Sequence, residues 1–359
     1  MNQAGSNQFR IAAIGGDGIG PEVVAAAVEV LDQLAAATGT FSLDWSHLDW
    51  DSARYLKSGK YLPDDALDQL RSHDAILFGA VGSQQVPDHV SLWGLRLAIC
   101  QGLDQYANVR PTRVLAGIHS PLADADGLDW VIVRENSEGE YSGQGGRSHR
   151  GQPHELATEV SIFTRRGVER IHRFAFELAR SRPDKHLTLV TKSNAQRFGM
   201  VLWDEIFYEV AADYPDVRTD RELVDAMTMR MVNKPASLDT IVATNLHADI
   251  LSDLAAALAG SVGIAPTANL NPERATPSMF EPIHGSAFDL VGKGVANPVA
   301  TFWSAAMMLE HLGQPQAATR LMAAIEAVTG SGPRTPDLGG TATTKDVTAA
   351  VCRALENAG

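Results

Sequence analysis

The chain has 359 residues, a formal net charge of −13 and a pI near 5.3. This length predicts two domains rather than one core, and a composition of 45% hydrophobic and 20% charged residues is typical of a globular protein. The acidic balance argues against nucleic-acid and membrane partners, and it means that an anionic substrate must be attracted by a local cluster of arginines.

The first expected strand, 10–14, leads into a glycine-rich turn, GGDGIG, which Pro21 follows. Strand, glycine turn and helix also open a Rossmann fold, whose fingerprint is G-x-G-x-x-G. The spacing here argues against that fold, because the last glycine comes one residue too early and Asp17 would put a carboxylate where a pyrophosphate would approach. Pro21 suits the first turn of a helix over 21–37.

Apolar runs then alternate with segments of helical periodicity, which favours an α/β fold. Further strands are expected at 41–46, 74–78, 129–133, 186–190 and 239–243. Further helices are expected at 63–71, 164–181, 195–211, 249–259, 298–312 and 316–328. The polar, glycine-rich segment 141–158 is too long for an ordinary turn, so it is expected to be a functional loop or an arm that reaches a second subunit.

The two cysteines, Cys100 and Cys352, lie far apart in the sequence. They form neither a disulfide framework nor a zinc-ligand pattern, and they fit a reducing, cytoplasmic compartment. The first ten residues, MNQAGSNQFR, contain no apolar core, so no signal peptide is expected. No apolar run approaches about 18 residues, so no transmembrane helix is expected.

Polar side chains follow two of the expected strands, where sites gather in open α/β sheets. After DWVIV comes RENSEGEY, in which Arg134 could clamp a carboxylate and Tyr141 could act as a general acid. After LTLVT comes Lys192, which could act as a base if burial or charge lowered its pKa. The alternatives are an ordinary polar loop and a solvated lysine. Arg110, in NVRP, says little alone.

Two aspartates, Asp249 and Asp253, are four residues apart, so on a helix their carboxylates share one face. Such a pair repels unless a cation lies between the two, and hard oxygen ligands select Mg²⁺ or Mn²⁺. The alternative is a helix N-terminus, which favours acidic side chains. Further on, EPIHGSAFD could let a flat ligand approach the backbone, and its Asp289 could bind a ribose diol. A tight surface loop is the alternative there.

In this order the motifs resemble the β-decarboxylating dehydrogenases, which include isopropylmalate, isocitrate, homoisocitrate and tartrate/D-malate dehydrogenases. The resemblance covers roughly residues 9–358 and rests on GGDGIGPE, DQYANVRP, VRENSEGEYSG, TKSNA, ELVDAM, NLHADILSDLAAALAGSVGIAPTAN and EPIHGSAFDLVGKGVANP. ENSEGEYSG, EPIHGSAFD and NPVATFWSAAMMLEHLG are most similar to the tartrate/D-malate branch. The resemblance implies the family's own α/β fold, with two domains around a large mixed sheet, and not a Rossmann fold.

The resemblance also implies a domain plan. Residues 1–105 and 260–359 would form a large domain with the NAD site, and residues 106–259 a small domain with the dimer interface. An arm at about 141–163 would clasp the partner in a homodimer with shared active sites. The implied cofactors are NAD and Mg²⁺ or Mn²⁺, with K⁺ as a further candidate, and the implied substrate is a small 2-hydroxy dicarboxylic acid.

The catalytic and metal-binding residues follow from matching the family's motifs. Asp249 and Asp253 of one subunit would bind the metal together with Asp225 of the partner subunit, which lies in ELVDAM. Lys192 of the partner subunit would take the hydroxyl proton, and Tyr141 would protonate the enol carbon after CO₂ departs. Asp249 would also hold the geometry of the metal and the base.

The adenosine half of NAD would be bound by His284, Gly285, Asp289 and Asn297. The carboxylate at Asp289 implies a preference for NAD, because it would repel the 2′-phosphate of NADP. The early glycine turn would then line the cleft near the nicotinamide end, where Asp17 meets no phosphate.

Three arginines usually bind the malate core in this family, and two are matched, Arg110 and Arg134. Cys100 stands at the place of the first. Losing a desolvated cation from such a site costs about 2–5 kcal/mol unless another replaces it. Arg96 lies one helical turn before Cys100 on the same face. Arg96 either restores the clamp, or binds a distal anionic group of a different substrate, or is merely solvated.

The expected function is NAD- and metal-dependent oxidation and decarboxylation of a malate-type 2-hydroxy acid, of the tartrate/D-malate kind. One alternative is a 3-isopropylmalate dehydrogenase, although the polar side chains of Gln101 and Arg96 would be unfavourable contacts for an apolar isopropyl group. Another is a family member for a different 3-substituted malate with an anionic side chain. A non-catalytic regulatory subunit is favoured only by Cys100, and the retained Lys192, Tyr141 and three aspartates argue against it.

Overall fold

The computed structural model describes residues 7–125 and 127–357, and in them helices and strands alternate along the chain. The chain divides into two compact units. Unit 1 comprises the described residues of 1–104, 114–121 and 256–359, and unit 2 those of 105–113 and 122–255. The expected division differs at 114–121 and at 256–259, which belong to unit 1, and at 105, which belongs to unit 2. Residues Gly117 and Ile118 pack in unit 1, where a Cβ on Gly117 would lie 2.5 Å from the Thr329 carbonyl oxygen.

Unit 1 contains strands in the order β2-β1-β3-β12-β11. Their bounds are Asn7–Gly16 for β1, Phe41–His47 for β2, Ala75–Ala80 for β3, Pro266–Leu270 for β11 and Ser278–Pro282 for β12. All neighbours pair in parallel except β11 and β12, which are antiparallel. The centre of β1, 11–14, is at most 2% exposed, because helices cover both faces of the sheet.

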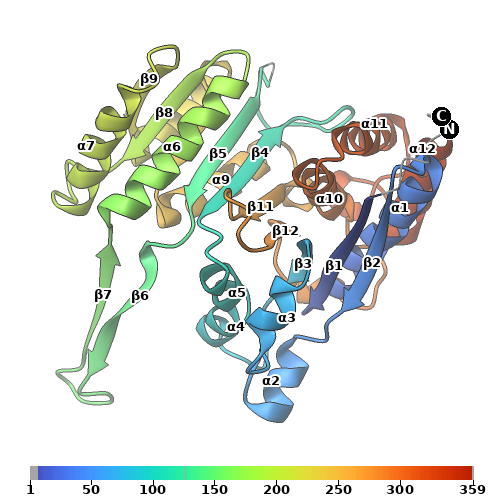
Figure 1. Cartoon of the computed structure of the whole chain (residues 1–359), viewed down its shortest axis with the longest axis horizontal. Coiled ribbons are helices and arrows are strands. Elements are labelled where there is room, and N and C mark those ends of the chain that lie inside the picture. The colour runs from blue at the N-terminus through green and yellow to red at the C-terminus, as the bar shows by residue number, and fades with distance from the viewer. Residues whose placement is uncertain (1–6, 126, 358–359) are drawn as a thin grey trace. The chain divides into compact units, whose positions relative to one another are not determined.

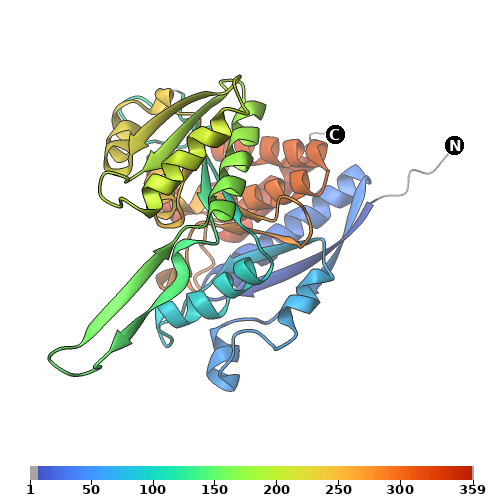
Figure 2. The same cartoon turned by 60° about the vertical axis from the view of Figure 1, so that its left-hand side comes forward.

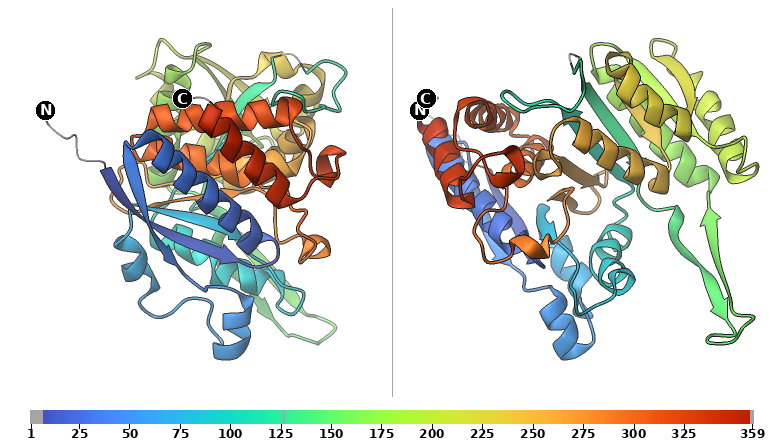
Figure 3. Two further views of the ribbon diagram at one scale, coloured as in Figure 1. Left: turned by 90° about the vertical axis from the view of Figure 1, so that its right-hand side faces the viewer. Right: turned by 180° about the vertical axis from the view of Figure 1, so that it is seen from behind.

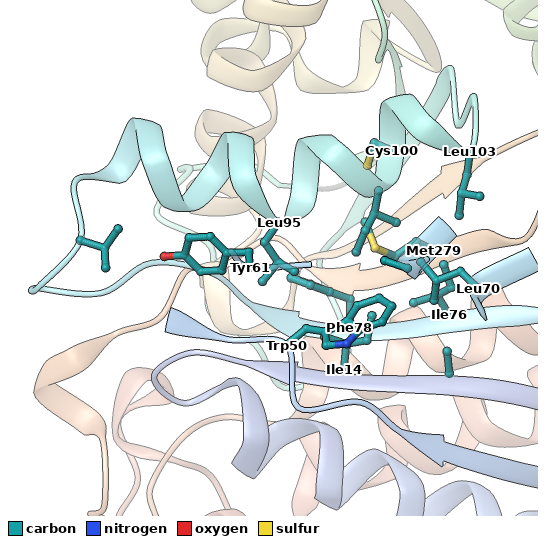
Figure 4. Close-up of a cluster of buried hydrophobic side chains, with 14 residues drawn as sticks. Ile14, Trp50, Tyr61, Leu70, Ile76, Phe78, Leu95, Cys100, Leu103 and Met279 are labelled. Carbon is teal, nitrogen blue, oxygen red and sulfur yellow. The ribbon is translucent and has the colours of Figure 1, made fainter. Parts of the chain in front are cut away.

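The helices of unit 1 are α1 (Gly20–Thr38), α2 (Ser52–Ser58), α3 (Ala66–Arg71), α4 (Asp88–Gly94), α5 (Arg96–Gly102), α10 (Val299–His311), α11 (Pro315–Ser331) and α12 (Thr344–Asn357). On one face of the sheet α1 lies beside α12 and α10 beside α11 (Figures 2 and 3). On the other face a buried cluster joins α3 and α5 to the strands, and it includes Ile14, Phe78, Leu95, Cys100 and Met279 (Figure 4).

Unit 2 contains strands in the order β4-β5-β10-β8-β9. Their bounds are Ala107–Arg113 for β4, Asp129–Glu135 for β5, His186–Thr191 for β8, Arg218–Leu223 for β9 and Thr240–Ala243 for β10. β4 is antiparallel to β5, and the other neighbours are parallel. The carboxyl ends of β5, β8 and β10 therefore meet at one edge of the sheet, where sites form in open α/β sheets.

The helices of unit 2 are α6 (Arg165–Ser181), α7 (Gly199–Ala211), α8 (Val224–Asn233) and α9 (Asn245–Leu258), the last of which ends just inside unit 1. α6 covers one face of the strands and α9 the other (Figures 1 and 3). Strands β6 (Gly139–Ser148) and β7 (Leu156–Ile162) form a separate antiparallel hairpin that extends away from the rest of unit 2 (Figures 1 and 2). Short 3₁₀ turns at 235–237, 262–264, 288–290 and 336–338 complete the described elements.

The α/β expectation is confirmed, since every expected strand and helix has a counterpart. The missed strands are short or polar. For example, β9 reads RTDREL, and β6 is rich in glycine and mostly exposed. The helix expected from 249 begins at Asn245, immediately after β10. Among the described residues, no helix combines the length and the apolar character needed to cross a bilayer.

The glycine turn after β1 joins backbone segments of unit 1. A Cβ on Gly18, which has φ +63°, would lie 2.0 Å from the Ser286 carbonyl oxygen. The buried carboxylate of Asp17 accepts hydrogen bonds from the Ser52 backbone N–H (2.7 Å), the Ser52 hydroxyl (2.8 Å) and the Gly82 N–H (2.9 Å). The glycines here permit close backbone approach, and Asp17 satisfies buried donors, so this turn is an internal junction.

Candidate active site

Helix α9 carries the two aspartates expected to bind metal. Because α9 begins at Asn245, Asp249 lies in its second turn and Asp253 one turn later on the same face. The alternative explanation of Asp249 as an acidic residue in the first helical turn is therefore wrong. Partial burial and the nearby charge of Asp249 both raise the pKa of the Asp253 carboxyl. Burial and mutual repulsion oppose the ionisation of these two adjacent carboxylates, and a divalent cation that prefers oxygen ligands would relieve both effects.

Three side chains converge on the Asp249 carboxylate. Arg134, at the end of β5, donates to it directly, Nη1 of Arg110 on β4 lies 3.4 Å away, and the Tyr141 hydroxyl donates to it at 3.2 Å. The two arginines are 2% and 4% exposed, and the Arg134 guanidinium lies 5.1 Å from the Tyr141 ring centre. An ordinary solvated loop is therefore the wrong description of RENSEGEY.

Lys192 and Asp225 form a second group. Lys192 follows β8, and its Nζ lies 2.6 Å from Oδ1 of Asp225 in the first turn of α8. This hydrogen bond lowers the pKa of the Asp225 carboxyl. Within 7–125 and 127–357, no three His, Cys, Asp or Glu side chains of one chain gather to hold a metal. The three expected metal ligands therefore fall into two groups, Asp249 with Asp253 and Asp225 with Lys192.

The residues expected to bind the adenosine half of NAD lie in unit 1. Nδ1 of His284 is 3.0 Å from the Gly285 carbonyl oxygen, and its buried Nε2 has no hydrogen-bond partner in the part of the chain that the structure describes. Burial lowers the pKa of His284. A Cβ on Gly285 would meet open space, and Asp289 is exposed on the 3₁₀ turn 288–290. A buried ring nitrogen without a partner, and open space at the neighbouring Gly285, fit a ligand with its own donors and acceptors.

The Asn297 side chain is held by unit 1 itself. Its Nδ2 donates to Asp337 at 2.9 Å, and its Oδ1 accepts from the Val299 N–H at 3.0 Å. Asp337 also accepts from the Ser261 hydroxyl at 2.7 Å. Both ends of the Asn297 amide therefore have protein partners, and any contact of Asn297 with NAD stays a prediction.

Arg96, the first residue of α5, lies inside unit 1. It is 9% exposed, its Nε donates to Glu281 on β12 at 2.7 Å, and its Nη2 donates to Asn269 on β11 at 3.2 Å. The interpretation of Arg96 as a solvated side chain is therefore wrong, because a buried carboxylate and a buried amide hold it. Cys100 is 1% exposed and belongs to the buried cluster of Figure 4. Whether Arg96 contacts substrate stays a prediction.

Sequence reasoning missed two residues beside the clamp arginines. Asn245 is 1% exposed and accepts from Arg134, and it could have been noticed as a polar residue directly after a buried strand. Glu135 is 2% exposed and accepts hydrogen bonds from Ser137 and Glu138, and burial raises its pKa to about 7. Glu135 stands beside Arg134 in RENSEGEY, but its burial at the end of β5 depends on tertiary packing that the sequence does not reveal.

Known proteins resemble this chain over nearly its whole length. It is 66% identical to a probable tartrate dehydrogenase/decarboxylase of Agrobacterium vitis, over 97% of this chain and 98% of the relative. It is 50% identical to the D-malate dehydrogenase [decarboxylating] of Escherichia coli strain K12, over 97% and 98%. The crystal structure of isocitrate dehydrogenase from Methylococcus capsulatus matches with a TM-score of 0.89 at 38% identity, over 97% and 99%.

Residues 10–351 match the family described as "Isocitrate/isopropylmalate dehydrogenase". The close relatives are named dehydrogenases and decarboxylases, so this chain is an oxidoreductase that acts on a CH–OH group. The expected fold is confirmed by the structural match. The family match spans almost the whole chain and agrees with the names of similar proteins and with the fold, so the chain belongs to the isocitrate/isopropylmalate dehydrogenase family.

Proposed function

We propose that this chain oxidises and decarboxylates a malate-type 2-hydroxy dicarboxylic acid of the tartrate/D-malate kind, with NAD and Mg²⁺ or Mn²⁺. The observation that carries the proposal is the convergence of two buried arginines and a tyrosine on Asp249, with Asp253 one turn away. The names of the relatives support the choice of substrate. We place the protein in the cytoplasm, which its low content of cysteine, two residues far apart in the sequence, supports.

Arg110 and Arg134 bind and orient the substrate carboxylates. Both are buried, so their guanidiniums lie in a medium where a carboxylate partner is worth more than in water. Asp249 and Asp253 hold the metal, together with Asp225 of the partner subunit. A bound Mg²⁺ or Mn²⁺ supplies Lewis-acid polarisation of the hydroxyl and carboxylate oxygens of the substrate.

Two side chains move protons. NAD, when bound, would supply the acceptor for the C2 hydride, and Nζ of Lys192 of the partner subunit would take the hydroxyl proton. The bond to the β-carboxylate then breaks, CO₂ leaves, and the electron pair of that bond forms an enolate. The Tyr141 hydroxyl gives its proton to the enolate carbon as general acid. Its hydrogen bond to Asp249, at 3.2 Å, orients the hydroxyl beside the arginines.

A homodimer with shared active sites completes this arrangement. Apolar side chains exposed on unit 2 lie on α7 and directly before it, on α8, on α9 and on the β6–β7 arm: Leu156, Val160, Phe198, Tyr208, Met229, Val232 and Ile250. Exposed apolar side chains in such number are typical of an interface. The separation of Asp225 and Lys192 from Asp249 within one chain also supports a site that two subunits build together.

Mixed dimers test the shared site. We expect Lys192→Ala and Asp249→Asn to be inactive alone. When the two are co-expressed, about half the dimers are mixed and each has one intact site, so activity returns to about a quarter of wild type. In the matched control, the two variants are expressed separately and their dimers are mixed under conditions in which subunits do not exchange. Continued inactivity of the verified mixed dimer would refute the shared site.

The reaction itself is tested by NADH production with Mn²⁺ over D-malate, the tartrates, 3-isopropylmalate, isocitrate and homoisocitrate. We expect D-malate or a tartrate to have the highest kcat/KM. Highest kcat/KM for 3-isopropylmalate would overturn the substrate assignment. Inactivity with all five classes would favour a regulatory subunit or another 3-substituted malate.

A further inference from the structure

Asn245 joins three parts of the candidate active site. Its side chain is 1% exposed at the start of α9, and its Oδ1 accepts a hydrogen bond from Nε of Arg134 at 2.8 Å. Its Nδ2 donates to the Glu138 carbonyl oxygen at 3.2 Å. The second partner of Arg134, Asp249, lies four residues further along the same helix. The guanidinium is thus held along α9 at two points one helical turn apart.

We propose that Asn245 is a positioning residue, which sets the orientation of Arg134 toward the substrate carboxylate and fixes the backbone that carries Tyr141. This inference rests on the proposed function of Arg134 and Tyr141. Asn245 touches neither substrate nor cofactor in this role, because it acts through the arginine and the 138–141 segment.

The carboxamide suits this place because one of its ends accepts and the other donates. A donor, Arg134 Nε, and an acceptor, the Glu138 carbonyl, face the same side chain, and both are costly to leave without a partner when buried. A carboxylate could serve the arginine, but it would repel the carbonyl. It would also place a second negative charge on the cation that binds the substrate.

The other clamp arginine has the same kind of support. Nε of Arg110 donates to Oδ1 of Asn108 at 2.8 Å, and Asn108 is fully buried. Each guanidinium is therefore anchored at Nε by a neutral amide oxygen. A neutral acceptor fixes direction without cancelling charge, which is what a carboxylate-binding arginine requires.

Asn245 also lies beneath the turn that leads to Tyr141. Gly139 has φ +70°, and a Cβ on it would lie 3.7 Å from the Cβ of Asn245. The chain therefore passes close to Asn245 at Gly139, directly after the Glu138 carbonyl that Asn245 binds. Two residues later Tyr141 donates to Asp249. Loss of the Asn245 amide would release the arginine and the tyrosine together.

The test compares Asn245→Ala and Asn245→Asp with a matched control, Asn271→Ala. Asn271 is a buried asparagine of unit 1 whose amide also accepts at one end and donates at the other, but only to backbone groups: it accepts from the Ala275 N–H at 2.8 Å and donates to the Asp104 carbonyl oxygen at 3.0 Å. The full-length dimer is assayed for kcat and KM with D-malate, NAD and Mn²⁺ at low and high salt, and its Tm is measured.

We expect Asn245→Ala to lower kcat/KM by about tenfold to a hundredfold, the size of one lost hydrogen bond to a charged group. Asn245→Asp retains an acceptor for Arg134 and a similar volume, yet its KM should exceed that of Asn245→Ala, and high salt should narrow the gap. Asn271→Ala should lower the Tm and leave KM unchanged.

Several outcomes would overturn the inference. If Asn245→Ala and Asn271→Ala lose similar Tm and neither changes kcat/KM, Asn245 is only structural. If Asn245→Asp has the KM of wild type, a neutral acceptor is not required, and this holds even where Asn245→Ala fails to fold. The proposed function is tested separately by the wild-type enzyme and by Arg134→Lys. If wild type oxidises D-malate and Arg134→Lys has a much lower kcat/KM, the proposed function stands and the results above concern Asn245 alone. If wild type is inactive, both the proposed function and the role of Asn245 are overturned.

Discussion

Asp249→Asn removes a carboxylate from between two buried cations. Arg134 and Arg110 are 2% and 4% exposed, and both form ion pairs with Asp249. Asparagine has nearly the same volume, so the change is mainly electrostatic. Breaking a fully buried pair from one side costs about 3–5 kcal/mol, and the 36% exposure of the Asp249 side chain makes this range an upper bound. At about 2–4 °C per kcal/mol, the Tm of the metal-free protein should fall measurably, by up to about 20 °C.

A dicarboxylate should recover part of this loss. In wild type without metal, tartrate must compete with Asp249 for the arginines, whereas in Asp249→Asn it supplies their missing negative charge. At about 100 times its dissociation constant, tartrate would return about 2.7 kcal/mol. The assay is thermal unfolding in EDTA, with and without tartrate, followed by the same scan with Mn²⁺.

Asp253→Asn is the matched control on the same helix face. Asp249 raises the pKa of Asp253, so removing that charge relieves repulsion, and the metal-free Tm should stay near wild type. Both variants should lose the stabilisation that Mn²⁺ gives to wild type. The reasoning is refuted if metal-free Asp249→Asn unfolds at the wild-type temperature, or if tartrate stabilises both proteins equally.

Three further predictions concern other positions. Asp289→Lys should shift cofactor preference from NAD toward NADP. An unchanged ratio of kcat/KM for NAD and NADP would contradict the assignment of Asp289 to the adenosine ribose. Arg96→Leu should lower the free energy of unfolding by about 3–5 kcal/mol because it strands buried Glu281, and Glu281→Gln should restore part of it; full stability of the single variant in urea would contradict this. His172 is buried with a pKa lowered to about 3, so the unfolded chain takes up a proton near pH 6.5 that the folded chain refuses. The stability that this gives above pH 6.5 is therefore lost on acidification, by about 2 kcal/mol at pH 5. In His172→Leu, the free energy of unfolding measured with urea should change less between pH 7.5 and pH 5 than in wild type.

Local patterns determined the α/β fold class and several candidate residues of this protein, and the family resemblance supplied the others, such as Asp225 and Asn297. Continuous apolar runs such as 11–14 predict buried strands, and helical spacing predicts the helices, because both depend only on neighbours along the chain. Arg134, Tyr141 and Lys192 were found because polar residues at strand ends are a local signal. The i, i+4 spacing of Asp249 and Asp253 on α9 is a local signal of the same kind.

Only the tertiary structure decided which side chains meet. Arg134 contacts Asp249 across 115 residues, and Arg96 contacts Glu281 across 185. No periodicity encodes such pairs, since they depend on which strand edges become neighbours and which charges are buried together. For the same reason the sequence left Arg96 open between substrate and solvent, and it hid the bridge that Asn245 makes at the start of α9. Packing gives these residues their partners, and the partners give them their chemistry.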